Sequence, residues 1–92
     1  MAFKRLELVY AGAMEMTDFR ETAEKFATAH GLTGYVRKFP NGTVKVLAEG
    51  DERELKKFMR DFNEDMGIWV DRFSQHWFAA TGEYSKFRFL NI

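Results

Sequence analysis

The sequence predicts an α+β sandwich, in which two helices cover one face of a mainly antiparallel sheet. Several short segments alternate apolar and polar residues, which is typical of strands that are buried on one face. Two longer segments repeat apolar residues at helical spacing. The chain has 92 residues, a length that allows one domain, and we assign residues 1–92 to it.

The first half begins with a strand and a helix. Residues 4–11 alternate, and the face predicted to be buried comprises Leu6, Leu8 and Tyr10. A helix is predicted from about Asp18 to His30, with Asp18 or the competing Thr17 as its N-terminal cap. Gly31 is expected to end it in the left-handed conformation, with the next residue packing back. The buried stripe of this helix comprises Phe19, Ala23, Phe26, Ala27 and His30.

A hairpin follows the first helix. Residues 34–39 and 43–49 alternate as two strands, and Pro40-Asn41-Gly42 joins them in a turn. Gly50 is expected to end the second of these strands.

The last part of the chain repeats the helix and the strand. Asp51 and Glu54 mark a helix start and Gly67 its end, and the apolar stripe between them comprises Leu55, Phe58, Met59, Phe62 and Met66. Residues 68–78 are predicted to form a long strand, whose Trp69, Phe73 and Trp77 we expect in the core. Residues 86–92 form a short closing strand. The order βαββαβ, with this extra C-terminal strand, is that of a ferredoxin-like sandwich.

The composition excludes several classes of function. Fourteen basic and fourteen acidic residues cancel, so no overall field attracts nucleic acid or an anionic membrane. The chain has no cysteine, which excludes disulfides, thiolate metal sites and cysteine nucleophiles. No apolar run approaches the roughly 20 residues that a membrane span needs. We therefore expect a cytoplasmic monomer without nucleic-acid or membrane partners.

The stretch from Gly12 to Arg20 carries the candidate chemistry, because it joins a strand to the start of a helix. Backbone N–H groups at a helix N-terminus have no intrahelical acceptors and can hold an anion. Arg20 lies in the first helical turn, where a cation opposes the helix dipole and needs another reason to be present. An ordinary solvated arginine is the alternative interpretation.

Six stretches of the sequence together carry a resemblance to a known family: Gly12 with Phe19-Arg20, Gly31–Arg37, Pro40–Val46, Ala48–Gly50, Val70–Arg72 and Thr81–Phe89. Through them the chain resembles the acylphosphatase family over nearly its whole length. The family hydrolyses acyl phosphates, which are mixed anhydrides of a carboxylate and phosphate, without metal or cofactor. Donors fixed around the phosphoryl oxygens and one placed water suffice, because the leaving carboxylate is already good.

The resemblance implies a site built on the family loop G-x-V-Q-G-V-x-F-R. Its amides and its arginine hold the phosphoryl group, and an asparagine on the second strand orients the attacking water. In this chain the phosphate-binding loop is Gly12, Ala13, Met14, Glu15, Met16, Thr17, Asp18 and Phe19, followed by Arg20. An acyl phosphate or inorganic phosphate is the small-molecule partner that the resemblance implies.

Three positions depart from the family pattern: Glu15 replaces the glutamine, Met16 the second glycine and Lys38 the asparagine. Methionine restricts a turn that needs a positive φ, so Met16 is expected to misaim the loop amides. The carboxylates of Glu15 and Asp18 partly cancel the charge of Arg20. Asp18 has the alternative of capping the helix.

Lys38 is the most consequential departure. An asparagine amide both donates and accepts, whereas a protonated lysine only donates. Lys38 can attract phosphate as a point charge, but it cannot accept a hydrogen bond from the attacking water. We therefore assign Arg20 and Lys38 as the catalytic candidates and expect turnover to be weak or lost; a plain solvated strand lysine is the alternative.

Other chemistry finds little support in the sequence. His30 and His76 lack a zinc-ligand spacing, and no nucleotide-binding glycine motif is present, so we predict neither a metal site nor a cofactor. RNA recognition is disfavoured because the outer faces of the first and third strands carry no aromatic residue. Two functions stay open: hydrolysis of acyl phosphates, and non-catalytic binding of phosphate or of a partner.

Overall fold

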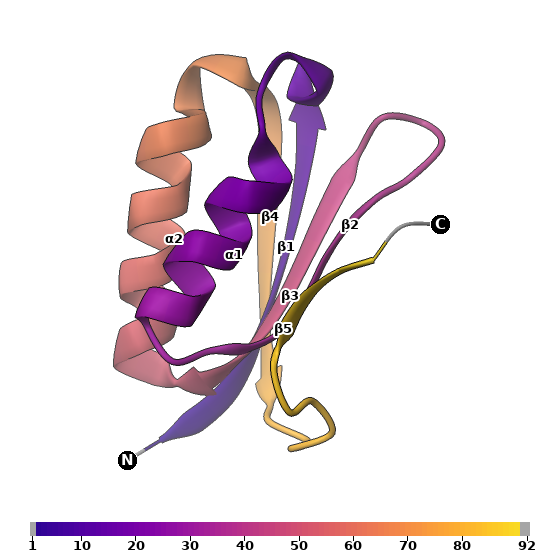
Figure 1. Ribbon diagram of the computed structural model, residues 1–92. Coiled ribbons are helices and arrows are strands. Elements are labelled where there is room, and N and C mark those ends of the chain that lie inside the picture. The colour runs from indigo at the N-terminus through magenta and orange to yellow at the C-terminus, as the bar shows by residue number, and fades with distance from the viewer. Residues whose placement is uncertain (1, 91–92) are drawn as a thin grey trace.

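The computed structural model describes residues 2–90 and confirms the α+β sandwich, with two helices on one face of a mostly antiparallel sheet (Figure 1). The elements in chain order are β1 (Phe3–Gly12), the 3₁₀ helix η1 (Met14–Met16), α1 (Phe19–Ala29), β2 (Thr33–Lys38), β3 (Val44–Asp51), α2 (Glu52–Met66), the 3₁₀ helix η2 (Gly67–Trp69), β4 (Val70–Ala79) and β5 (Phe87–Leu90). The last two residues of the predicted closing strand, 91 and 92, lie outside the described range.

The strands of the described sheet lie in the order β4-β1-β3-β2-β5. Every neighbouring pair is antiparallel except β2 and β5, which run parallel. Strands β1 and β2 therefore flank β3, and α1 connects them across the covered face (Figure 1). This is the ferredoxin-like order with β5 added beside β2.

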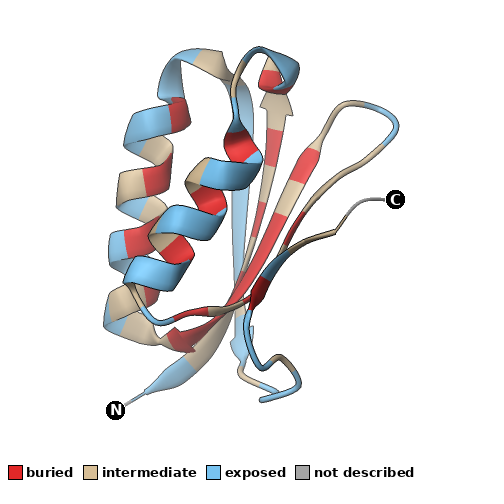
Figure 2. Ribbon diagram, viewed as in Figure 1, coloured by how far each residue is buried: buried red, intermediate tan, exposed pale blue. Residues whose placement is uncertain are grey.

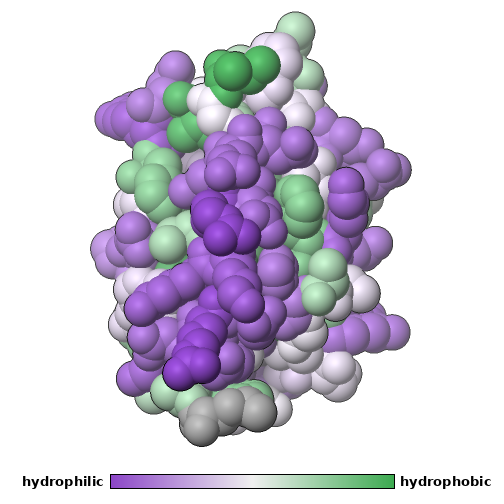
Figure 3. All heavy atoms as spheres, turned by 90° about the vertical axis from the view of Figure 1, so that its left-hand side faces the viewer, coloured by the Kyte–Doolittle hydropathy of each residue, from purple (hydrophilic) through white to green (hydrophobic). Residues whose placement is uncertain are grey.

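The core lies between the helices and the sheet, where the buried residues of both layers face each other (Figure 2). The predicted strand residues Leu6, Leu8 and Tyr10 are buried, as are Leu55, Phe58, Phe62 and Met66 of α2. Phe26 and Met59, which were also predicted for the stripes, are partly buried and pack against the core. The outer surface over α2 is mainly hydrophilic (Figure 3). Between residues 2 and 90, no helix is long and apolar enough to cross a membrane.

The end of α1 confirms the predicted glycine stop. Gly31 has φ +67°, and its N–H donates to the Thr28 carbonyl at 3.1 Å. The Leu32 N–H donates to the Ala27 carbonyl at 2.9 Å, which completes a Schellman motif. The predicted helix starts are also confirmed, because Asp18 and Asp51 occupy the N-cap positions of the two helices. Neither side chain accepts a capping hydrogen bond, so the capping role predicted for the Asp18 side chain is wrong.

Two predicted boundaries in the second half are also wrong. Gly50 does not end β3, because it pairs with Lys4 and the strand continues to Asp51. Strand β4 begins at Val70 rather than at residue 68. Gly67 keeps right-handed helical angles (φ −50°, ψ −41°), so the chain continues through one turn of 3₁₀ helix before it extends.

The aromatic residues predicted for the core of the fourth strand are less buried than expected. Phe73 is 37% exposed, and Trp77 is partly buried against the core. Trp69 lies in η2 and not in the strand. The reason is that β4 is an edge strand of the described sheet, so one of its flanks has no neighbouring strand to cover it.

The connection from β4 to β5 carries the chain from one edge of the sheet to the other. The carboxylate of Glu49, which is buried on β3, holds this connection. It accepts hydrogen bonds from the backbone N–H groups of Thr81 at 3.0 Å and Gly82 at 2.9 Å, and from Arg5 Nε at 2.8 Å. The position of β5 beside β2 therefore depends on a contact across the uncovered face of the sheet.

Candidate functional site

A hollow of about 360 Å³ lies where β1 and β2 end and α1 begins. It is lined by Glu15, Met16, Thr17, Asp18, Phe19, Arg20 and Lys38. The lining residues come from η1, from the two residues that join it to α1, from the first turn of α1 and from the last position of β2. The structure thus brings both catalytic candidates together with five residues of the predicted loop.

Three residues of the predicted loop do not line this hollow. Gly12 ends β1 with φ +148°, and a Cβ at this position would lie 2.3 Å from the Trp69 carbonyl oxygen. The Ala13 N–H donates to that same carbonyl at 2.8 Å. The Met14 side chain is fully buried. These residues anchor the loop to η2 and to the core.

The loop turns through η1, which the sequence did not predict. The Met16 N–H donates to the Ala13 carbonyl at 3.0 Å, and the Thr17 N–H donates to the Met14 carbonyl at 3.3 Å. No residue other than glycine between positions 2 and 90 has a positive φ, so Met16 is accommodated without strain. The consequence is that two loop N–H groups are already used inside the loop.

The Arg20 guanidinium lies over two aromatic rings at the edge of the hollow. Its Cζ atom is 4.3 Å from the centroid of the Phe89 ring and 5.5 Å from that of the Phe19 ring. Arg20 is exposed, whereas Phe19 is 3% exposed. Both aromatic rings therefore attract the exposed guanidinium through cation–π contacts.

Lys38 approaches the hollow from the sheet. It is the last residue of β2 and pairs with Val44 of β3. Because side chains alternate along a strand, Lys38 shares the helix-covered face with Val36, which is fully buried. The exposed carboxylates of Glu15 and Asp18 line the same hollow, which therefore holds two cationic and two anionic side chains.

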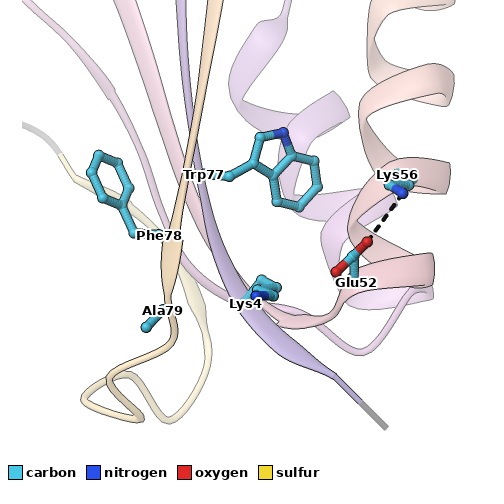
Figure 4. Close-up of a pocket in the computed structure, with 6 residues that line it drawn as sticks. All are labelled: Lys4, Glu52, Lys56, Trp77, Phe78 and Ala79. Carbon is cyan, nitrogen blue, oxygen red and sulfur yellow. Dashed lines mark ion pairs between the residues drawn. The ribbon is translucent and has the colours of Figure 1, made fainter.

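A second hollow, of about 450 Å³, lies at the opposite end of the sheet (Figure 4). It is lined by Lys4, Glu52, Lys56, Trp77, Phe78 and Ala79, and Lys56 Nζ pairs with Glu52 at 3.1 Å. None of the predicted site residues lies there. Over the described range, no group of three histidine, aspartate or glutamate side chains is placed to hold a metal ion.

Phe89 is the residue at this site that sequence reasoning missed. Its alternation with Phe87 was visible in the sequence, and it places both rings on one face of a strand. The contact with Arg20 depends on β5 lying beside β2, which sequence periodicity does not reveal.

The fold and the hollow define a small α+β sandwich with a candidate anion site at one end of its sheet. A family model described as acylphosphatase matches residues 6–89. The acylphosphatase of Caldanaerobacter subterraneus subsp. tengcongensis is 31% identical over 87 residues, which cover 92% of this chain and 96% of that protein. The acylphosphatase of Marinobacter nauticus is 32% identical over 90 residues, with 96% and 97% covered.

A solved structure shows the same fold. The crystal structure of acylphosphatase from Bacillus subtilis has a TM-score of 0.87 and 21% sequence identity, and the match covers 96% of this chain and 99% of that one. The chain belongs to the acylphosphatase family. Family membership implies acyl phosphates or phosphate as the class of substrate.

Proposed function

We propose that this protein hydrolyses acyl phosphates to a carboxylate and phosphate in the hollow between η1, α1 and β2. The observation that carries the proposal is that Arg20 and Lys38, which lie far apart in the sequence, line one hollow beside the first turn of a helix. First-turn N–H groups have no intrahelical acceptors and attract anions. The two cations add charge where a phosphoryl dianion needs it.

In the proposed reaction, a water molecule attacks the phosphorus atom. The bond between phosphorus and the acyl oxygen breaks, the carboxylate leaves with the bonding electrons, and the protons of the water stay with the phosphate product. Arg20 presents a fork of donors to the phosphoryl oxygens, and Lys38 acts as a point charge. Because both groups supply positive charge themselves, we propose that the reaction needs no metal or cofactor.

The rate is expected to be low, since a protonated lysine offers no acceptor to orient the water. The assay compares wild type, Arg20→Ala and Lys38→Asn on a model acyl phosphate. We expect Arg20→Ala to lower kcat/KM by roughly a hundredfold, a typical loss for one removed transition-state donor. Lys38→Asn should raise kcat by roughly tenfold, because an amide can place the water.

Lys25→Ala is the matched control for this assay, because Lys25 is an exposed cation on α1 that does not line the hollow. Its activity should equal that of the wild type. If pure wild-type protein shows no turnover and Lys38→Asn is equally inactive, hydrolysis at this site is wrong.

Phosphate binding without turnover is the second candidate, and the loop geometry favours it. Met16 and Thr17 donate their N–H groups to carbonyls within the loop, which leaves fewer donors for a transition state. This function predicts that inorganic phosphate shifts the amide NMR signals of residues 14–19 although no hydrolysis occurs. An unchanged spectrum at millimolar phosphate would contradict both candidates.

The biological setting that we propose is that of a cytoplasmic monomer. Net charge of zero and the absence of cysteine support this setting, because neither a membrane surface nor an oxidising compartment is favoured by them. Gel filtration and cell fractionation of the tagged protein test it directly.

A further inference from the structure

We propose that Phe89 is a positioning residue that holds the Arg20 guanidinium over the hollow. The inference rests on the proposed phosphate-binding role of Arg20. Its geometric basis is the 4.3 Å separation between the Arg20 Cζ atom and the centroid of the Phe89 ring. Phe89 packs against the core, so its ring has little freedom to follow a mobile partner.

Arginine needs such a support at this position. A cation in the first turn of a helix is repelled by the partial positive charge of the helix N-terminus. The long side chain also loses rotamer freedom when it is held in one place. An aromatic face attracts the guanidinium and offsets both effects.

Stacking and phosphate binding use different parts of the guanidinium. The ring attracts the flat face, whereas the five N–H donors lie in the plane and point outward from its edges. The Arg20 Cζ atom lies over the Phe89 ring, so this ring can hold the guanidinium without occupying a donor that a phosphoryl oxygen would use. Phe19, whose ring centroid is 5.5 Å from the same Cζ atom, supports the guanidinium from its own helix.

The sheet places Phe89 on the strand next to the one that carries the second catalytic candidate, Lys38. Phe89 pairs with Val36 in the parallel register of β5 and β2. Lys38 follows Val36 by two residues and shares its face of the strand. Strand β5 thereby places the aromatic ring that contacts Arg20 next to the strand that carries Lys38.

The alternative is that Phe89 contributes packing alone. Phe87 provides the matched control, because it lies on the same strand and is 7% exposed. Its ring packs against Phe58 at 6.4 Å between centroids. No cation–π contact joins Phe87 to Arg20 within residues 2–90. Replacing either ring by leucine removes aromatic packing, but only the change at Phe89 removes the support of Arg20.

The experiment measures the NMR signal of the Arg20 Nε–H group and the affinity for inorganic phosphate in wild type, Phe89→Leu, Phe89→Tyr and Phe87→Leu. The ring current of Phe89 should shift the Arg20 signal upfield in wild type, and Phe89→Leu should abolish that shift. We expect Phe89→Leu to weaken phosphate binding by roughly fivefold to tenfold, and Phe89→Tyr to bind within about twofold of wild type. Urea unfolding of each variant measures its loss of stability.

Phe87→Leu should lose stability at least as much as Phe89→Leu and should keep the wild-type Arg20 signal and phosphate affinity. The inference is overturned if Phe89→Leu leaves the Arg20 signal in place, or if both leucine variants weaken phosphate binding equally. The Arg20 signal is recorded without phosphate. A wild-type protein that neither binds nor hydrolyses anything would therefore refute the proposed function, while the signal still decides the role of Phe89.

Discussion

Gly34 occupies a position at which any side chain would collide with the neighbouring strand. It lies in β2 with φ +135°, and a Cβ there would be 1.9 Å from the backbone oxygen of Leu47. That oxygen belongs to β3 and cannot move aside without a shift of the sheet. The glycine therefore allows β2 and β3 to pair closely near the start of β2.

We expect Gly34→Ala to destabilise the protein by roughly 3 kcal/mol, because it combines an unfavourable φ with a backbone collision. Gly31→Ala is the matched comparison, since Gly31 has φ +67° but a Cβ added there would meet no atom of another part of the chain within 4 Å. That variant should lose about 1 kcal/mol. Urea unfolding measures both, and equal losses would show that the collision with Leu47 is not what Gly34 avoids.

At the scale of elements, His30 joins the two helices. It follows the last residue of α1, and its ring lies between two carboxylates of α2. Nδ1 is 3.0 Å from Glu54 Oε1, and Nε2 is 3.0 Å from Asp61 Oδ2. The hydrogen bond with His30 is the leading reason that the pKa values of Glu54 and Asp61 lie below their usual range. The helical spacing placed His30 on the apolar stripe; instead, its ring lies at the polar margin of the helix pair.

We expect His30→Ala to raise the pKa values of Glu54 and Asp61 towards their ordinary values, because both carboxylates lose a hydrogen-bond partner. Carboxyl titration by NMR measures this directly. His76→Ala serves as the control, since His76 is exposed on β4, at the edge of the sheet. Titration midpoints that stay unchanged in His30→Ala would contradict the helix-joining role.

At the scale of the whole molecule, Glu49 determines where the last strand lies. Burial by itself raises the pKa of its carboxyl. Hydrogen bonds from the Thr81 backbone, Arg5 and Gly82 outweigh burial and lower the pKa to about 2. The folded state therefore binds this proton less readily than the unfolded chain, whose carboxyl has an ordinary pKa of 4.5.

The stability that Glu49 contributes is complete above the unfolded pKa and is lost as the pH falls from about 4.5 towards about 2. A shift of this size corresponds to about 3 kcal/mol. We expect the free energy of unfolding of Glu49→Gln to be lower than that of the wild type by a similar amount at pH 7. Its stability should also fall less steeply as the pH drops from about 4.5 towards about 2. Urea unfolding between pH 2 and pH 7 checks this. Glu24→Gln, which changes an exposed carboxylate on α1, should keep the wild-type pH dependence, and an unchanged pH dependence in Glu49→Gln would contradict the role of Glu49.

Much of the fold was predictable from the sequence because its elements are recorded in local periodicity. The alternation of Leu6, Leu8 and Tyr10 and the stripe from Leu55 to Met66 each predict one buried face. All of these residues are buried in the structure except Met59, which is partly buried against the core. The glycine stop at Gly31 is equally local, because only the backbone of adjacent residues is involved. Family membership also follows from the order of residues along the chain.

What only the tertiary structure decided is which distant residues meet. Lys38 reaches the hollow of Arg20 because β2 ends beside the loop, and Phe89 lies under Arg20 because β5 crosses to the far edge of the sheet. The loop that holds the 3₁₀ turn is anchored by the hydrogen bond from the Ala13 N–H to the distant Trp69 carbonyl. The exposure of Phe73 likewise reflects the position of β4 at the edge of the described sheet. Periodicity reports the environment of one face of one element, whereas strand order and loop geometry are set by contacts between elements.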